Sequence, residues 1–319
     1  MLEYVVCHHE QIKNNLAPRG ESGLAPSLTI MMQPRNLLLA LLPPLCWGTG
    51  FTFSKPAVSH FQPLFMMLMV YGSIALVMLL TLRDMPKTPW PKLLVISACS
   101  VTIQGALLFS AMAYVDATTA NLVLQTQVPI AILLGWLLLG ETLDARKIIG
   151  TTIALAGVAI VIGLPQERPP LFAVAVVIVA GGVWALGQVL TRLWSQDSGL
   201  LVLKANALFG VPQLLLATLL LENGQWQSIA TATPLQWFYL AFVGIIGFYV
   251  AYVAWFTLLK RVRVDEATPF VLLMTPIGVL TAVLVLGERL QWPQVVGGSI
   301  LLLGLAVVSG ALKVPLRRA

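Results

Sequence analysis

The sequence predicts an all-α integral membrane protein: ten transmembrane helices form two inverted five-helix repeats, and both termini are cytoplasmic. Three observations support this fold class. Hydrophobic residues make up 58% of the chain and charged residues only 10%, whereas a soluble domain carries about 25% charged residues. Ten apolar stretches are long enough to cross a bilayer, which takes roughly 20 residues each. Part of the sequence also occurs twice.

The repeat is clearest in the second part of each half. Pro129–Val161 aligns without a gap onto Pro276–Val308, 147 residues later, with 14 identities in 33 positions. The shared residues include Gly140, Glu141, Gly150 and Gly157, which align with Gly287, Glu288, Gly297 and Gly304. Further upstream, Trp47 resembles Trp184. Such duplication in an apolar chain is typical of secondary transporters that bind substrate between their halves.

Apolar length and turn residues set the expected helix limits. The expected spans are 37–55, 63–82, 92–114, 117–139, 146–163, 171–192, 199–221, 235–258, 266–286 and 293–312. Breakers such as Met85–Pro86 and Pro169–Pro170 mark the loops. The weakest boundary, at Tyr114–Asp116, is supported by the repeat, because its counterpart is plainly a loop.

The distribution of Lys and Arg predicts the orientation. With the N-terminus in the cytoplasm, sixteen Lys and Arg residues fall on the cytoplasmic side and three on the other, as the positive-inside rule requires. Five spans per half is an odd number, so the second half enters the membrane in the opposite direction and the repeats are inverted.

These limits divide the chain into four parts. We expect a polar N-terminal extension (1–36), a first five-helix repeat (37–163), a second repeat (171–312) and a basic cytoplasmic tail (313–319). The extension lacks the apolar core of a signal peptide. Met31–Met32 stands just before the first span and is an alternative start.

Several function classes are disfavoured. The net charge of +6 is explained by short loops, and no basic run with interleaved aromatics indicates nucleic-acid binding. Three cysteines and three histidines show no metal-ligand spacing and no catalytic motif, so we expect no enzyme, metal or cofactor. The expected partners are the lipid bilayer and a small-molecule substrate.

No charge lies in the middle of a span, so binding is expected to rest on uncharged polar groups. Asn121 and Gln125 are four residues apart and share one helix face, followed by Pro129. Gln104 follows Ser100 at the same spacing, as Gln188 follows Trp184. The alternative for each pair is hydrogen bonding between neighbouring helices.

Aromatic residues are further candidates for substrate binding. Trp47 follows Pro43–Pro44, which should kink span one and free carbonyl groups. Tyr249 and Tyr252 share a face of span eight, and Thr275 stands beside Pro276 in span nine. Lipid-facing packing is the alternative for the aromatic residues of span eight.

Charged residues at span ends are candidates for gating or coupling. Glu141 and Glu288 end spans four and nine, where they either act as protonatable gates or cap the next helix. Lys55 ends span one and either reaches the outer surface or takes part in gating. Asp116 and Asp265 are interpreted as helix starts.

Spans five and ten contain few polar residues. Their glycines recur three to four residues from other small residues, which favours close helix packing. We expect these spans to form scaffold and to offer a face for a homodimer.

The whole pattern resembles the drug/metabolite transporter superfamily and, within it, the EamA family, over about residues 37–312. The resemblance is carried by Trp47–Gly48 with Phe51 and Lys55, by Asn121–Gln125, by the two Gly-Glu turns and by the glycine-spaced spans after them. Span four and Tyr239–Val243 in span eight are most similar to the O-acetylserine/cysteine exporter branch.

The sequence also departs from the family pattern. Gly50 and Val70 replace the Asn and Arg that many members carry. Without the Arg at position 70, a cationic anchor for a substrate carboxylate or phosphate is not expected. The resemblance implies export of amino acids, their derivatives or other small metabolites across a bacterial inner membrane. Together with the inverted repeats, we expect an alternating-access exporter of small neutral or zwitterionic metabolites. The alternative is a passive facilitator for small amphiphilic metabolites.

Overall fold

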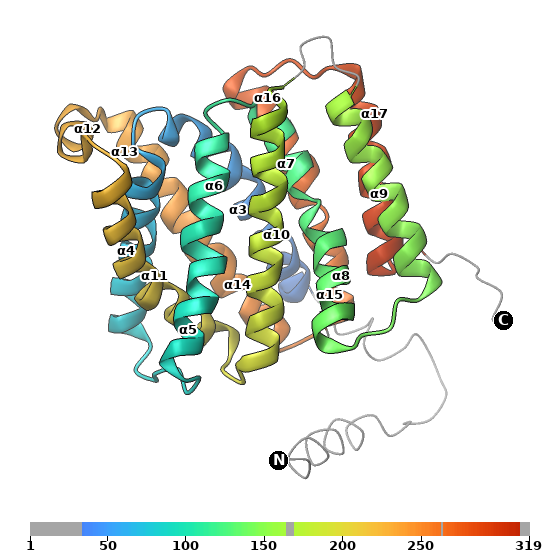
Figure 1. Ribbon diagram of the computed structural model, residues 1–319, viewed down its shortest axis with the longest axis horizontal. Helices are drawn as coiled ribbons and strands as arrows, with labels where there is room; N and C mark the ends of the chain where they lie inside the picture. Colours follow the sequence, from blue (N-terminus) through green and yellow to red (C-terminus); the bar gives the residue numbers. More distant parts are fainter. Residues whose placement is uncertain (1–33, 164–168, 263, 313–319) are drawn as a thin grey trace.

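The structure is a computed structural model that describes residues 34–163, 169–262 and 264–312. Its described part contains ten helices long and apolar enough to span a membrane (Figure 1). In chain order the spans are α3 (Pro34–Val58); α4 (Pro63–Thr81); α5 (Trp90–Ser97), a π-helical segment (Ala98–Ile103) and α6 (Gln104–Ala111); α7 (Ala117–Leu124) and α8 (Gln127–Leu139); α9 (Ala145–Gly163); α10 (Leu171–Trp194); α11 (Gly199–Leu221); α13 (Pro234–Ala241), a π-helical segment (Phe242–Val250) and α14 (Ala251–Leu259); α15 (Val264–Val271) and α16 (Met274–Leu286); and α17 (Trp292–Ser309).

The expected all-helical fold with ten spans is therefore confirmed. The doubtful boundary between spans three and four is a turn, because the helix ends at Ala111 and α7 begins at Ala117. Asp116 is the N-cap of α7, and its carboxylate accepts a hydrogen bond from the Thr119 N–H at 2.6 Å. The expected N-terminal extension up to residue 33 and the tail at 313–319 lie outside the described residues.

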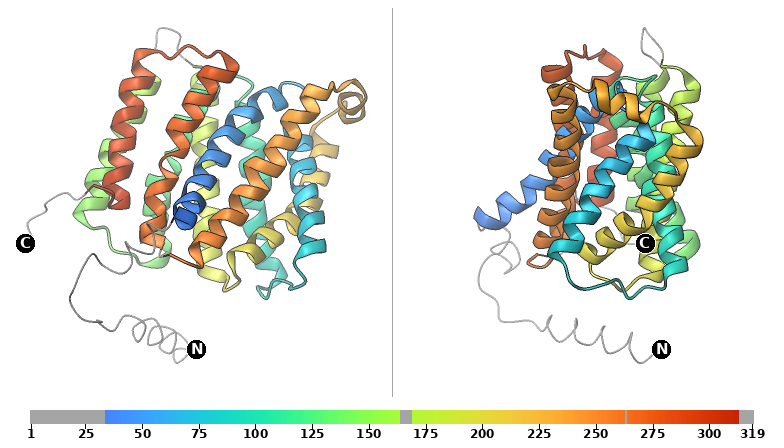
Figure 2. Two further views of the ribbon diagram at one scale, coloured as in Figure 1. Left: turned by 180° about the vertical axis from the view of Figure 1, so that it is seen from behind. Right: turned by 90° about the vertical axis from the view of Figure 1, so that its left-hand side faces the viewer.

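The spans run across a slab with their loops at two faces. We call the face at which α3 begins the N-terminal face and the other the opposite face. α3 crosses the bundle obliquely (Figure 2). A short helix, α12 (Gln225–Thr231), lies in the connection from α11 to α13 at the opposite face (Figure 1).

Helices α9 and α17 pack on each other at one end of the molecule (Figures 1 and 2). Their glycines allow this close approach: a Cβ at Gly157 would meet backbone atoms of Gly297 and Leu301, and one at Gly304 would meet Gly150 and Ala154. The glycine faces are thus buried within one chain. A homodimer through these spans remains a prediction, and it would have to use their outer faces.

The other helix pairs recur when the two halves are exchanged. α3 packs against α16 as α10 packs against α8, and α4 packs against α11. Span three packs against α10 as span eight packs against α3. Both π-helical segments also occupy the same place, eight residues after their span begins.

The largest buried cluster lies where α4, α6 and α11 meet the aromatic face of span eight. Its core includes Phe61, Met66, Met67 and Leu214, and Tyr249 and Tyr252 pack against it. Burial of these side chains holds span eight, which carries the candidates Tyr249 and Tyr252, against the core.

Candidate functional site

Two spans are broken near their middle. In span four, residues 125–126 form a turn between α7 and α8, and in span nine residues 272–273 separate α15 from α16. Pro129 and Pro276 follow each break and cannot donate a backbone hydrogen bond. Non-helical backbone at membrane depth is tolerated where protein buries it or where it lines a cavity, so the breaks mark the centre of the molecule.

The most polar buried cluster lies at the break in span four. The Gln125 side-chain amide donates to Thr275 Oγ1 at 2.7 Å, joining spans four and nine. Thr52 of span one donates to the Gly278 carbonyl oxygen at 2.9 Å. Gln125 and Thr275 were expected from sequence, whereas Thr52 and Gly278 were not. Spans one, four and nine therefore meet at one point.

Asn121 is the unusual member of this cluster. It is 1% exposed, and neither its Nδ2 nor its Oδ1 has a hydrogen-bond partner within the described residues. A Cβ at Gly278 would overlap its Nδ2, so the amide lies directly against span nine. A buried amide without a partner costs about 1–3 kcal/mol, and such groups call for a functional explanation.

Aromatic rings cover the same region from spans one and eight. The ring centroids of Trp47 and Tyr252 are 5.4 Å apart, and those of Trp47 and Trp255 are 6.0 Å apart. A Cβ at Gly50 would overlap the Gly247 Cα, which explains how the two spans approach so closely. Tyr252 also stacks on Phe256, with centroids 6.0 Å apart. Trp47 and Tyr252 thus form one aromatic surface, while Tyr249 packs into the adjoining core.

Spans three and six contribute a second polar set. The Ser100 hydroxyl is buried without a partner among the described residues, and a Cβ at Gly187 would overlap it. Gln104 follows the π-helical segment directly, and Gln188 follows Gly187; both side chains are half-buried. Trp184 is also half-buried but makes no ring contact with Trp47 in the described part of the chain, so these two tryptophans do not form a stacked pair.

Two of the charged candidates make contacts that the sequence did not predict. Of the two alternatives for Lys55, the structure does not show the reach to the outer surface: its ammonium donates to the carbonyl oxygens of Met112 and Val115 after span three. Glu288, expected to cap the next helix, caps α7 of the other half. Its carboxylate accepts from the Ala117 and Thr118 N–H groups at 2.7 and 3.0 Å. The next helix, α17, has its own capping box.

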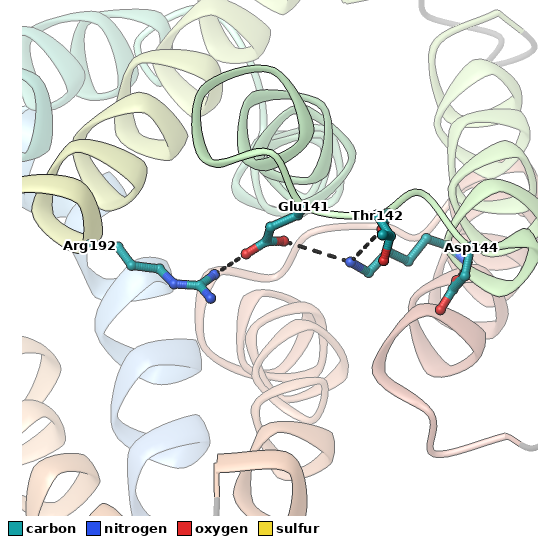
Figure 3. A network of polar contacts seen from close by, with 5 residues as sticks. Glu141, Thr142, Asp144 and Arg192 are labelled. Atoms are coloured by element: carbon teal, nitrogen blue, oxygen red, sulfur yellow. Dashed lines mark hydrogen bonds and ion pairs between the residues drawn. The ribbon is translucent and has the colours of Figure 1, made fainter. Parts of the chain in front are cut away.

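Glu141 lies at the N-terminal face between two cations. Its carboxylate forms an ion pair with Arg192 at the end of α10 and lies 3.6 Å from the Lys147 ammonium of α9 (Figure 3). Glu141 thus connects the two halves. Arg192 was counted in the sequence only as a loop charge.

The burial of one lysine was also not predicted from the sequence. The sequence counted Lys204 only among the cations of the cytoplasmic side, but it lies in α11 and is 1% exposed. Its ammonium donates to the carbonyl oxygens of Leu82 and Asp84 at 2.7 and 2.9 Å. Its position five residues inside the expected span was an available signal. Because the carbonyls satisfy it at a helix end, we assign it a structural role.

The described residues contain no group of three or more His, Cys, Asp or Glu side chains that could hold a metal ion. The cluster instead provides amide and hydroxyl groups for hydrogen bonding beside aromatic rings, where helices from both halves meet. These groups can hydrogen-bond to a small molecule and stack against it.

Comparison with known proteins identifies the class. The EamA-like transporter family matches residues 35–163 and again 170–310. The chain belongs to this family, and it is a transporter rather than an enzyme. It is a multi-pass protein of the bacterial inner membrane, and its relatives indicate export of metabolites.

Two curated relatives are named "Probable amino-acid metabolite efflux pump". The chain is 29% identical to the one from Escherichia coli strain K12 over 293 residues, covering 86% of this chain and 95% of the relative. It is also 29% identical to the one from Salmonella typhimurium strain LT2 over 288 residues, with the same shares covered.

A protein of known crystal structure has a similar fold. Its TM-score is 0.64 at 18% sequence identity, covering 87% of this chain and 99% of the other. At this identity the likeness concerns the fold alone.

Proposed function

We propose that this protein exports small neutral or zwitterionic metabolites, amino acids or their derivatives, by alternating access. The observation that carries the proposal is the Asn121 amide, buried at the meeting point of spans one, four and nine without a hydrogen-bond partner among the described residues. Its Nδ2 can donate to a carboxylate or carbonyl, and its Oδ1 can accept from an ammonium group. A bound zwitterion would satisfy both atoms.

The neighbouring residues complete this site. Gln125 and Thr275 fix the break in span four, and the rings of Trp47 and Tyr252 provide an apolar and cation-attracting surface. We include Gln104, Trp184, Gln188 and Tyr249 of spans three, six and eight in the proposed binding region. The names of the two curated relatives support amino-acid metabolites as the substrate class.

We infer that the two halves are inverted repeats and that the N-terminal face is cytoplasmic. The helix pairs that recur on exchange of the halves support the first inference. The excess of Lys and Arg at that face supports the second. Substrate then binds between the halves, and their rocking exposes it to one face at a time.

A passive facilitator is the second candidate. It is favoured by the neutral character of the cluster, since Asn121, Gln125 and Thr275 make no hydrogen bond to an ionisable side chain among the described residues. Coupling to protons usually employs a titratable group inside the membrane.

Counterflow in proteoliposomes tests both candidates. Vesicles containing the protein are preloaded with amino acids and derivatives, including O-acetylserine and cysteine, and uptake of labelled substrate is measured with and without a pH gradient. We expect saturable exchange that Asn121→Ala abolishes. Gln227→Ala, which truncates an exposed amide at the opposite face, is the matched control and should exchange normally.

Accumulation driven by the gradient would establish coupled export. Exchange without accumulation would establish the facilitator. Exchange that is equal in Asn121→Ala and wild type would remove Asn121 from the site, and no exchange with any compound would exclude this substrate class.

A further inference from the structure

The two faces of the molecule carry related charged contacts. Glu141 and Glu288 are aligned repeat residues 147 positions apart. Lys55 and Arg192 are 137 positions apart, the same separation as Trp47 and Trp184. Each half therefore provides one glutamate after a broken span and one cation at the end of its first span.

At the N-terminal face, this pair is joined directly. Arg192 ends α10 in the second half, Glu141 follows α8 in the first, and their side chains form an ion pair (Figure 3). The other cation on Glu141 is Lys147, 3.6 Å away. Lys147 belongs to the same half as Glu141. Of the two ion pairs of Glu141, the one with Arg192 therefore joins residues of different halves.

At the opposite face, the equivalent residues hold the turn between spans three and four from two sides. Lys55 binds the carbonyl oxygens of Met112 and Val115 at the start of this turn. Glu288, from the second half, binds the N–H groups of Ala117 and Thr118 at its end. Like the pair at the N-terminal face, Glu288 connects the two halves.

We propose that the Arg192–Glu141 ion pair is the cytoplasmic gate of this transporter, and that Lys55 and Glu288 form the equivalent gate at the opposite face. This inference rests on the alternating access proposed above. Opening of the cytoplasmic side requires the guanidinium to leave the carboxylate, because the ion pair joins the end of α10 to the end of α8 at this face.

The exposure of the pair fits this role. The Arg192 side chain is 71% exposed and that of Glu141 26% exposed. Solvent weakens such a pair, so that breaking it shifts a two-state equilibrium by only about two- to fivefold. A gate needs a contact of this strength, since a much stronger one would hold the transporter in one state.

Cysteine accessibility tests the gate without any substrate. The native cysteines are replaced by alanine, and Gln188→Cys places a thiol one turn before Arg192 on α10. A membrane-impermeant maleimide is then added to inside-out vesicles, and the labelling rate is measured. We expect Arg192→Gln and Glu141→Gln each to raise the rate about two- to fivefold.

Two further variants make the result specific. Lys147→Gln also removes a cation from Glu141 but breaks no contact between the halves, so it should leave the rate unchanged. The exchanged pair, Arg192→Glu with Glu141→Arg, should return the rate toward wild type.

The proposal is wrong if neither glutamine variant exceeds Lys147→Gln, or if the exchanged pair labels as fast as the single variants. If the variant with the exchanged pair is not expressed in the membrane, the labelling rates of the two glutamine variants and of Lys147→Gln decide whether the proposal holds. Because labelling requires no substrate, a failure here is distinct from a failure of the substrate class, which only the counterflow assay measures.

Discussion

The hydrogen bond between Gln125 and Thr275 illustrates how a single residue can serve both structure and transport. Both side chains are buried, at 6% and 1% exposure, and the bond joins the two broken spans. The sequence presented two readings of Gln125, substrate binding and contact between helices. The structure supplies the helix contact, while Asn121, one turn away, is left with its amide unpartnered.

Removing one member of this bond should cost more stability than removing both. Thr275→Val leaves the buried Gln125 amide without its partner, which we expect to lower the free energy of unfolding by about 1–3 kcal/mol. Adding Gln125→Leu should recover part of this loss, because no polar group is then stranded. Thermal unfolding in detergent measures both effects. Equal stability of wild type and Thr275→Val would show that the bond contributes nothing, and equal stability of the single and double variants would show that the stranded amide carries no cost.

Asp197 gives a residue-level prediction outside the membrane. Burial alone would raise the pKa of Asp197, but hydrogen bonds from the Lys87 and Thr88 N–H groups and from hydroxyl groups hold it below its ordinary value of 3.8. The folded-state pKa is thus below the unfolded one. The stability that this carboxylate contributes is present above about pH 4 and is lost as pH falls through the folded-state pKa.

The measurement compares wild type with Asp197→Asn at a series of pH values. We expect wild type to unfold at the higher temperature near neutral pH, and the difference to shrink as the solution is acidified from about pH 5 to about pH 3. A difference that is constant over this range would mean that the Asp197 charge does not stabilise the contact between the loops.

At the scale of elements, the sequence indicated where helices lie better than how they are interrupted. Apolar length and turn residues identify all ten spans, because crossing a bilayer imposes a minimum length. The breaks after Leu124 and Val271 were not predicted. A proline inside an apolar run shows that one hydrogen bond is missing, but whether the helix bends or breaks depends on the neighbours that satisfy the freed groups.

The sequence also did not predict the hydrogen-bond partners of the charged residues. Glu288 caps a helix that begins 171 positions earlier in the chain, and a local rule can only suggest the next helix. For the same reason, the sequence predicted only some of the residues of the candidate site. Amide spacing identified Asn121 and Gln125, whereas Thr52 and Gly278 join the cluster only through packing between distant spans.

The contact between α9 and α17 allows a matched test at the scale of helices. A methyl group at Gly157 would overlap backbone atoms of Leu301 and Gly297, whereas at Gly163 it would meet nothing within 4 Å. We expect Gly157→Ala to lower the free energy of unfolding by about 1–3 kcal/mol, the usual cost of overpacking. Gly163→Ala should have little effect. Equal thermal unfolding of the two variants would show that the contact is loosely packed.

For the whole molecule, the proposed orientation is open to direct measurement. Asn223 is exposed in the connection after α11 at the opposite face, and Gln196 is exposed in the turn between α10 and α11 at the N-terminal face. In a cysteine-free background, Asn223→Cys should react with an impermeant maleimide in intact cells. Gln196→Cys should react only in inside-out vesicles. The reverse pattern would place the N-terminal face outside.

The glycine contact also bears on how far the two copies of the repeat can diverge. An added side chain at Gly157 cannot be accommodated by changes within its own copy, since the atoms it would meet are backbone atoms of the other copy. Gly150, Gly157, Gly297 and Gly304 are accordingly still shared by both copies. Four residues before the aligned prolines, by contrast, Gln125 stands against Leu272. The contact between α9 and α17 therefore limits which substitutions each copy can accept, whereas residues of the binding region can differ between the copies.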